Sequence, residues 1–179
     1  ARSSRARHHA QAQPQFALGF AGALVAAREA VGVLAKGRHH HGGIGRAQLE
    51  ERPRISEIRF AVRENQLGDP SRVTDADYHW FSENPGIWVW EEDGRILGFS
   101  AADTRDGTIW ALFIDPEHEG RGIGRALLTK ACAVLRDAGH RTATLTTDPG
   151  TRADCFYREA GWTALGIDER GEQIFRSAL

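Results

Sequence analysis

Three strand-like segments joined by two Asp-Gly pairs constrain the fold of this chain more than any other feature of its sequence. The short apolar segments occupy residues 87–91, 95–102 and 108–114. They are separated by Asp93-Gly94 and Asp106-Gly107, residue types that tolerate the positive φ angles of two-residue hairpin turns. The pattern therefore predicts an antiparallel meander of three strands.

The flanking sequence adds helices and further strands. Residues 58–62 alternate as on a strand, and a short helix beginning near Thr74 is expected to end by Pro85. After the meander, apolar residues recur at spacings of three and four, which predicts a helix of about 16 residues through Ile123, Leu127, Ala131, Val134 and Ala138. The remainder predicts a strand, a short helix and two closing strands over residues 142–147, 151–160, 162–167 and 172–179. This order is typical of a mixed sheet with helices packed on it, an α/β fold of the α+β type.

The length and the cysteine content favour one intracellular domain. A chain of 179 residues can bury a core without disulfide bonds. Cys132 and Cys155 are too few for a disulfide framework or a four-ligand zinc site, and we expect both to be buried as small apolar residues. A reduced, cytoplasmic protein is therefore expected.

Charge divides the chain into two parts. Residues 1–54 carry nine Lys or Arg against three Asp or Glu, a balance of +6, whereas residues 55–179 carry fourteen against twenty-one, a balance of −7. We expect the first part to be a basic extension or linker, partly helical or disordered, and the second to be the folded domain. The negative domain favours a cationic amine over a nucleic acid as its partner.

Two segments of the extension have more than one interpretation. Residues 16–27 are an apolar run of twelve residues, shorter than the roughly 20 that cross a membrane. With the arginines before it, this run imitates a targeting segment, although a short helix or a disordered extension is favoured. Residues 37–54 have the composition of a linker. The three histidines at 39–41 lie in this glycine-rich stretch without fixed geometry, so no metal site is predicted.

The glycine-rich stretch 114–125 is the most informative part for function. Its sequence is Ile-Asp-Pro-Glu-His-Glu-Gly-Arg-Gly-Ile-Gly-Arg, and it joins the last meander strand to the long helix. Its three glycines allow a ligand to approach the backbone, and the free N–H groups and positive dipole of the helix start attract an anion. Arg121 and Arg125 add positive charge. The stretch therefore predicts an anion site suited to phosphate.

Two common phosphate motifs do not fit this loop. Both the P-loop and the dinucleotide fingerprint require a glycine at residue 125, which is Arg. A tight turn whose glycines serve only packing is the alternative that the loop alone leaves open.

A second motif, about thirty residues later, makes the pattern more specific. Residues 156–162 fit the pattern Phe-Tyr-x-x-x-Gly-Phe with Trp at the last place. Residues 114–124 fit a strand–Asp–Pro followed by Arg/Gln-x-x-Gly-x-Gly/Ala. With these motifs and its element order, the chain over about 55–179 strongly resembles the GNAT superfamily of acyl-CoA-dependent N-acyltransferases.

The resemblance implies a fold, a reaction and partners. The sheet would be mostly antiparallel, with helices on both faces. The protein would transfer the acetyl group of acetyl-CoA to a primary amine of a small molecule or peptide, by direct attack in a ternary complex. Acetyl-CoA would be a cosubstrate, and no metal, nucleic acid or membrane would take part. The resemblance leaves a homodimer possible.

The resemblance also assigns roles to individual residues. The backbone of Phe113 and Ile114 would bind the pantetheine arm. Backbone groups of the loop would hold the CoA pyrophosphate, at Gly120, Arg121, Gly122, Ile123, Gly124 and Arg125. Tyr157 would act as the general acid that protonates the leaving thiolate. The alternative for Tyr157 is a core aromatic residue.

Two departures from the family pattern leave other functions open. Glu119 stands where the family usually has Arg or Gln, and an acid beside a pyrophosphate is unfavourable unless it points to solvent. Neither 108–114 nor 142–147 contains an acid that could deprotonate the amine, so a water chain or an amine of low pKa is expected. A non-catalytic acyl-CoA-binding module and an acyltransferase acting on RNA or protein remain alternatives. Five aromatic residues are expected mainly in the core, with one or two in the acceptor pocket: Trp80, Phe81, Trp88, Trp90 and Trp110.

Overall fold

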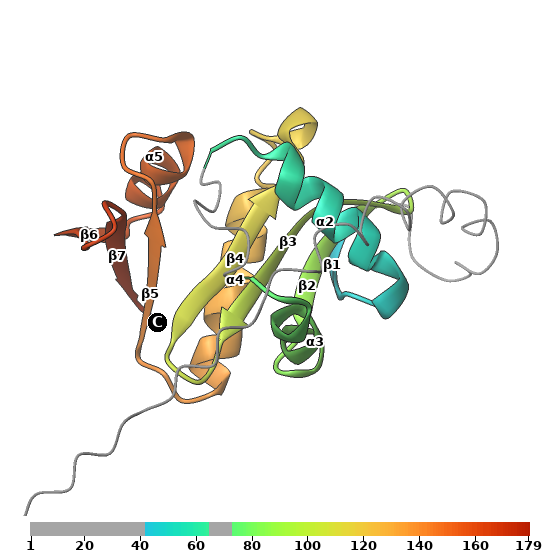
Figure 1. Ribbon diagram of the computed structural model, residues 1–179, viewed down its shortest axis with the longest axis horizontal. Coiled ribbons are helices and arrows are strands. Elements are labelled where there is room, and N and C mark those ends of the chain that lie inside the picture. Colours follow the sequence, from blue (N-terminus) through green and yellow to red (C-terminus); the bar gives the residue numbers. More distant parts are fainter. Residues whose placement is uncertain (1–41, 65–72) are drawn as a thin grey trace, which may run out of the picture. The chain divides into compact units, whose positions relative to one another are not determined.

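Seven strands form one sheet in the part of the chain that the computed structural model describes, residues 42–64 and 73–179. The strand order is β1-β2-β3-β4-β5-β7-β6 (Figure 1). These residues belong to one unit, Gly37–Leu179. In chain order the elements are β1 (Gly43–Arg46), η1 (Leu49–Glu51), α2 (Arg52–Ala61), α3 (Asp75–Glu83), β2 (Ile87–Glu92), β3 (Arg95–Asp103), β4 (Thr108–Ile114), η3 (Pro116–His118), α4 (Ile123–Asp137), β5 (Thr142–Thr147), α5 (Arg152–Glu159), β6 (Thr163–Ile167) and β7 (Gln173–Ala178).

The predicted meander is the centre of this sheet. β2, β3 and β4 pair antiparallel in sequence order, and the first turn has Asp93 and Gly94 at positive φ angles of 49° and 75°. The second turn is longer than predicted, because Asp103 pairs with Thr108 and leaves four residues in the turn. All neighbouring strands are antiparallel except β4 and β5, which are parallel. The predicted α/β fold with a mostly antiparallel sheet is confirmed.

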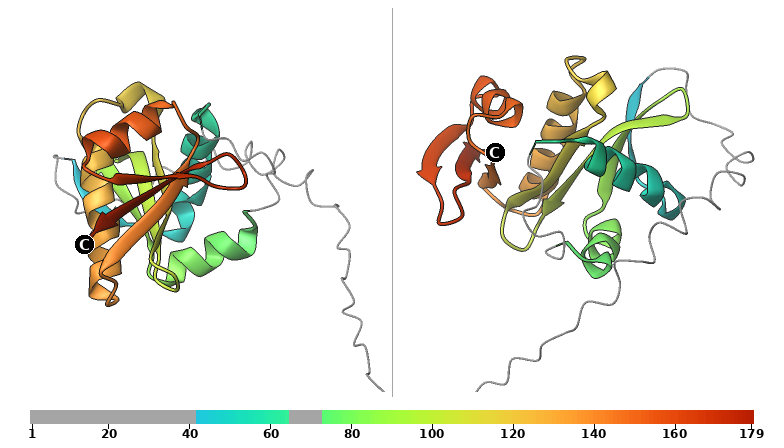
Figure 2. Two further views of the ribbon diagram at one scale, coloured as in Figure 1. Left: turned by 90° about the vertical axis from the view of Figure 1, so that its left-hand side faces the viewer. Right: turned by 45° about the horizontal axis from the view of Figure 1, so that its top comes forward.

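Helices cover both faces of the sheet (Figures 1 and 2). Successive side chains of a strand point to opposite faces. Val89 of β2 is therefore buried with Ile58 of α2, whereas its neighbour Trp90 packs with Leu127 of α4. Helices α2 and α3 lie in front of the sheet in Figure 1, and α4 lies behind it.

The strand predicted at residues 58–62 is wrong, because residues 58–61 belong to helix α2 and Val62 is its C-cap. Ile55 and Ile58 are 1% and 0% exposed, at the spacing of one helix face, whereas Phe60 is 75% exposed. Pro53 lies in the first helical turn, where its missing N–H costs no hydrogen bond. Five residues are too short a window to separate the two periods.

The linker predicted at residues 37–54 is wrong over its second half. Gly43–Arg46 form β1 at one edge of the sheet, with Ile44 opposite Trp90 of β2. A 3-10 turn then leads into α2. Four residues rich in glycine carry too little hydrophobic pattern to identify such an edge strand.

The expectations for residues 16–27 and for the histidines at 39–41 lie outside the described residues. Within the described ranges, no helix is both long enough and apolar enough to cross a bilayer.

Candidate active site

Strands β4 and β5 pair only at the start of β4, and a cavity lies beside the end of β4. Only Thr108 and Thr144 pair across the two strands, both of which are fully described. A cavity of about 440 Å³ is bounded by the end of α2, the end of β4, the loop before α4 and helix α5. Eight of the nine residues predicted for the site line it: Phe113, Ile114, Gly120, Gly122, Ile123, Gly124, Arg125 and Tyr157.

The three loop glycines have two different structural roles. Gly120 and Gly122 have φ angles of 73° and 81°, a conformation that favours glycine, and no atom lies within 4 Å of where a Cβ would stand. A Cβ on Gly124 would instead lie 3.6 Å from the ring of Phe156. The first two glycines therefore keep the backbone accessible from the cavity, whereas a Cβ at the third would be in ordinary van der Waals contact with α5.

The start of α4 can accept an anion. The helix has Gly122 at its N-cap, so no side chain caps its first-turn N–H groups. The first intrahelical bond runs from the N–H of Ala126 to the carbonyl of Gly122 at 3.1 Å. The N–H groups of the preceding helical residues thus lack partners within the helix, which is the arrangement that binds phosphate at helix starts.

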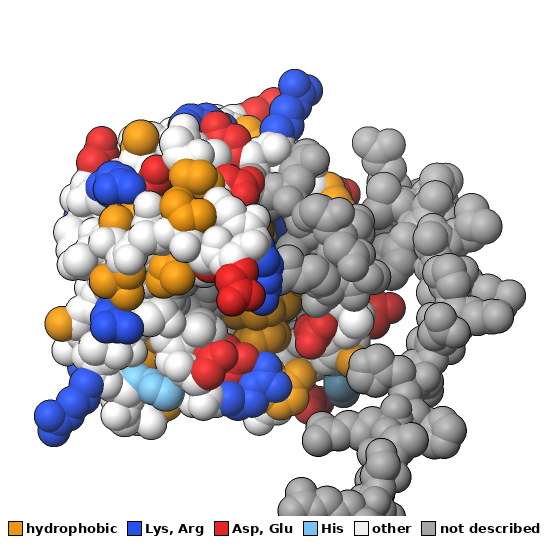
Figure 3. Space-filling model, turned by 60° about the vertical axis from the view of Figure 1, so that its left-hand side comes forward, with side chains coloured by type: hydrophobic (Ala, Val, Ile, Leu, Met, Phe, Trp, Pro, Cys, Tyr) orange, Lys and Arg blue, Asp and Glu red, His pale blue; other side chains and the backbone are white. Residues whose placement is uncertain are grey.

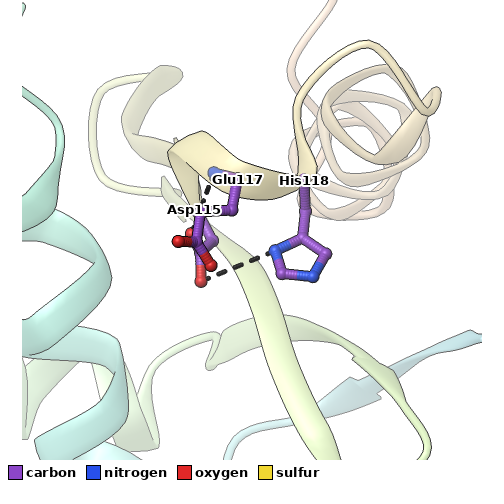
Figure 4. A group of neighbouring side chains, drawn as sticks. All are labelled: Asp115, Glu117 and His118. Atoms are coloured by element: carbon purple, nitrogen blue, oxygen red, sulfur yellow. Dashed lines mark hydrogen bonds and ion pairs between the residues drawn. The ribbon is translucent and has the colours of Figure 1, made fainter.

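Asp115 fixes the chain where β4 enters this loop (Figure 4). Its carboxylate accepts hydrogen bonds from the Glu117 N–H at 3.1 Å and from the Arg54 guanidinium of α2. Burial acts to raise the pKa of Asp115, but the Glu117 N–H and Arg54 outweigh it and hold the pKa below its ordinary value. Asp115, Glu117 and His118 could supply three metal ligands, but Arg54 already neutralises the central carboxylate, so we interpret the group as structural.

Asp115→Asn should make folding less sensitive to acid. The charged form of Asp115 stabilises the fold above its unfolded pKa, near 3.8, and this stabilisation disappears as the pH falls through the lower folded pKa. At pH 7 the variant should lose about 1–2 kcal/mol of unfolding free energy, and the difference from wild type should shrink towards pH 2. Urea unfolding at several pH values measures this, with exposed Asp137→Asn as the charge-matched control. A difference that stays constant with pH would contradict the assignment.

Tyr157 lies on α5 between the cavity and the core. The residue is 7% exposed, and its ring packs against Phe156, Trp162 and Phe175 at centroid distances of 5.2–5.8 Å. Burial, and to a lesser extent nearby Cys132, raise the pKa of its phenol above its ordinary value. The phenol is protonated at neutral pH, as an ordinary phenol also is, so its place at the cavity and not this shift suggests a role as an acid.

The two loop arginines point in different directions. Arg125 lines the cavity from the first turn of α4. The side chain of Arg121 is the one predicted site residue that does not line it, because its Nη2 donates to both carboxylate oxygens of Glu92, each at 2.8 Å. Arg121 can therefore contribute its backbone to an anion site, while its charge is paired elsewhere.

An ion network that the sequence analysis missed borders the cavity. Arg152, the first residue of α5, pairs with Glu119 of the loop and with Glu64 after α2, and all three line the cavity. The expected repulsion between Glu119 and a phosphate is therefore offset by a neighbouring cation. Glu119 and Arg152 are 33 positions apart, so no local sequence pattern could have paired them.

Four of the five aromatic residues pack in or against the core clusters, and Trp88 is half-buried outside them. Trp80, Phe81 and Trp110 belong to the cluster beneath α2 and α3, and none of the five lines the cavity. Trp88 faces α4, where the Lys130 ammonium lies 3.7 Å from its ring centroid. The expected burial of Cys155 is wrong, since this residue is exposed, whereas Cys132 is half-buried.

In the view of Figure 3, acidic and basic side chains of the described residues are interspersed. The face shown therefore carries no large patch of one charge sign.

Comparison with known sequences identifies similar proteins. The model of the acetyltransferase (GNAT) family matches residues 52–162. A mycothiol acetyltransferase from Cellulomonas flavigena is 32% identical over 120 residues, which cover 56% of this chain and 34% of the relative. An uncharacterized ycf52-like N-acetyltransferase from Prochlorococcus marinus is 32% identical over 83 residues, covering 43% of this chain and 45% of the relative. The chain thus spans less than half the length of these curated relatives.

Solved structures share the fold. N-acetylglutamate synthase from Neisseria gonorrhoeae, complexed with coenzyme A and N-acetyl-glutamate, has a TM-score of 0.64 at 19% identity, covering 79% of this chain and 36% of that one. A GNAT family acetyltransferase from Brucella melitensis in complex with acetyl-CoA has a TM-score of 0.57 at 23% identity, covering 79% and 90%. At these identities the likeness concerns the fold alone.

Proposed function

The chain belongs to the GNAT acetyltransferase family, and on this premise we propose that it transfers the acetyl group of acetyl-CoA to a primary amine of a small molecule or peptide. The observation that carries the proposal is one cavity that has an open helix start at one side and a buried tyrosine at another. The names of the matched relatives, which are acetyltransferases, support the acetyl donor.

The proposed donor site uses main-chain groups above all. Backbone N–H groups from Gly120 to Arg125 would bind the pyrophosphate of CoA at the start of α4. The edge of β4 at Phe113 and Ile114, which β5 does not pair, would bind the amides of the pantetheine arm. The main-chain groups present therefore fit acetyl-CoA in hydrogen-bonding capacity, and the open start of α4 suits its pyrophosphate.

The proposed reaction is a direct transfer. The amine nitrogen attacks the thioester carbon, the new C–N bond forms, and the C–S bond breaks as the tetrahedral intermediate collapses. Tyr157 gives its phenolic proton to the departing thiolate. The amine nitrogen releases one proton to water, and water returns one proton to the Tyr157 phenolate, so the protons balance over the cycle. β4 and β5 carry no carboxylate side chain that could take the amine proton directly. Of the titratable side chains that line the cavity, Glu64 and Glu119 are paired with Arg152, and Glu159 and His118 also face it.

An assay of thiol release tests the proposal. The protein is incubated with acetyl-CoA and a panel of primary amines, and free CoA thiol is measured against amine-free and protein-free controls. Amine-dependent release is the expected result. Binding of CoA without turnover on any amine would instead favour a non-catalytic CoA-binding module. The lack of a carboxylate on β4 and β5 is the observation in favour of that alternative.

We also propose that the catalytic domain begins by Gly43 rather than at residue 55, because β1 is paired with β2 in the sheet.

A further inference from the structure

Arg152 is held over the cavity by two acids from different parts of the fold. Its Nη1 donates to the Glu119 carboxylate in the phosphate loop. Its Nε lies 3.4 Å from Glu64, which also accepts the backbone N–H of Arg152 at 2.9 Å. The α2 end, the loop and the first turn of α5 thus fix one guanidinium at the rim of the cavity.

The held guanidinium still has donors to offer. An arginine side chain carries five N–H groups, two of them on each terminal nitrogen. Within the described residues, Arg152 uses Nη1 and Nε, and its Nη2 has no partner. The side chain is 63% exposed, so its remaining face is accessible to a ligand.

The charge balance of the cavity makes this cation important. Three glutamates line it, at positions 64, 119 and 159, against two arginines, Arg125 and Arg152. Arg121 is paired with Glu92 outside it. A ligand with several phosphate charges therefore depends on the few guanidinium groups that face the cavity.

We propose that Arg152 is a phosphate-binding residue for CoA, held in place by Glu119 and Glu64. This proposal rests on the proposed function. Glu119 of the loop does not repel the phosphates, because it is paired with Arg152 of α5, whose guanidinium faces the ligand. Arginine suits this role since its planar fork can bind a carboxylate on one edge and a phosphate on another.

Binding and turnover measurements on Arg152→Ala and on a charge-matched control test the role. Arg152→Ala should weaken CoA binding about tenfold, measured by calorimetry, and should flatten the dependence of affinity on salt. The turnover of S-acetylpantetheine, which lacks the nucleotide phosphates, should not change. Arg136→Ala, an equal charge change at the far end of α4, should leave CoA affinity unchanged.

A background in which both acids are neutral, Glu64→Gln with Glu119→Gln, separates phosphate contact from mere neutralisation, because Arg152 is paired with both. If Arg152 binds phosphate, removing it from this background should still cost several-fold in CoA affinity. If Arg152 only neutralises the two glutamates, removing it from this background should leave CoA affinity unchanged, which would overturn the proposal. An equal loss of CoA binding and of S-acetylpantetheine turnover in Arg152→Ala would also overturn it, by showing a structural role. Wild-type protein that binds no CoA would refute the proposed function itself, together with this inference.

Discussion

Gly122→Glu should reduce CoA affinity by about 100-fold or more, equal to roughly 2.7 kcal/mol of binding free energy. Gly122 has a φ angle of 81° at the N-cap of α4. A glutamate there would place a carboxylate on the N–H groups that the pyrophosphate needs, and would repel the phosphates. The positive φ strains any side chain at this position by about 1–2 kcal/mol. A Cβ meets no atom within 4 Å, so the fold should survive this cost. Calorimetric titration with CoA measures the effect.

Gly122→Gln serves as the matched control for that change. It has the same backbone strain and nearly the same volume but no charge, so it should lose much less affinity than the glutamate variant. Circular dichroism of both variants checks that the fold is intact. An unchanged dissociation constant in Gly122→Glu would refute the assignment of this loop to phosphate.

Tyr157→Phe should lower kcat about 100-fold while the KM for acetyl-CoA changes little. The phenol is the proposed acid for the thiolate, and its raised pKa keeps it protonated at neutral pH and above. The loss should therefore be nearly constant between about pH 6 and 9. Steady-state kinetics across this range, with thiol release as the signal, measures it.

Tyr78→Phe is the natural control, because the chain has two tyrosines. Tyr78 is on α3, its ring packs against Trp110 with centroids 5.6 Å apart, and it does not line the cavity. Removing its hydroxyl should leave kcat within a few-fold of wild type. If both variants behaved alike, Tyr157 would be a core aromatic and not the acid.

Local patterns predicted the parts of this fold that local forces determine. The Asp-Gly turn at residues 93 and 94 requires particular backbone angles, and the apolar face of α4 follows a repeat long enough to be unambiguous. The glycine loop was also predicted from local pattern, because its glycines indicate a backbone that a ligand can approach. Resemblance to a family then linked that loop to Tyr157.

Features that depend on tertiary contacts could not be predicted from such local patterns. Ile58 and Phe60 alternate in sequence, but only packing against the sheet decides that one is buried in a helix and the other exposed. Arg121 was expected to supply charge to the loop, yet Glu92 from the β2–β3 hairpin binds it. No sequence pattern pointed to Arg152 as a site residue, because its position at the cavity depends on a contact with Glu119, 33 positions away.

The single residue pair between β4 and β5 has a consequence for how this protein can diversify. Main-chain donors and acceptors belong to almost every residue type, so a donor site built from them survives changes of side chain. Under the proposed function, side chains along β4 and around the acceptor are then free to vary while the cosubstrate stays the same. Such a scaffold allows new acceptor specificities to evolve without loss of the acetyl donor.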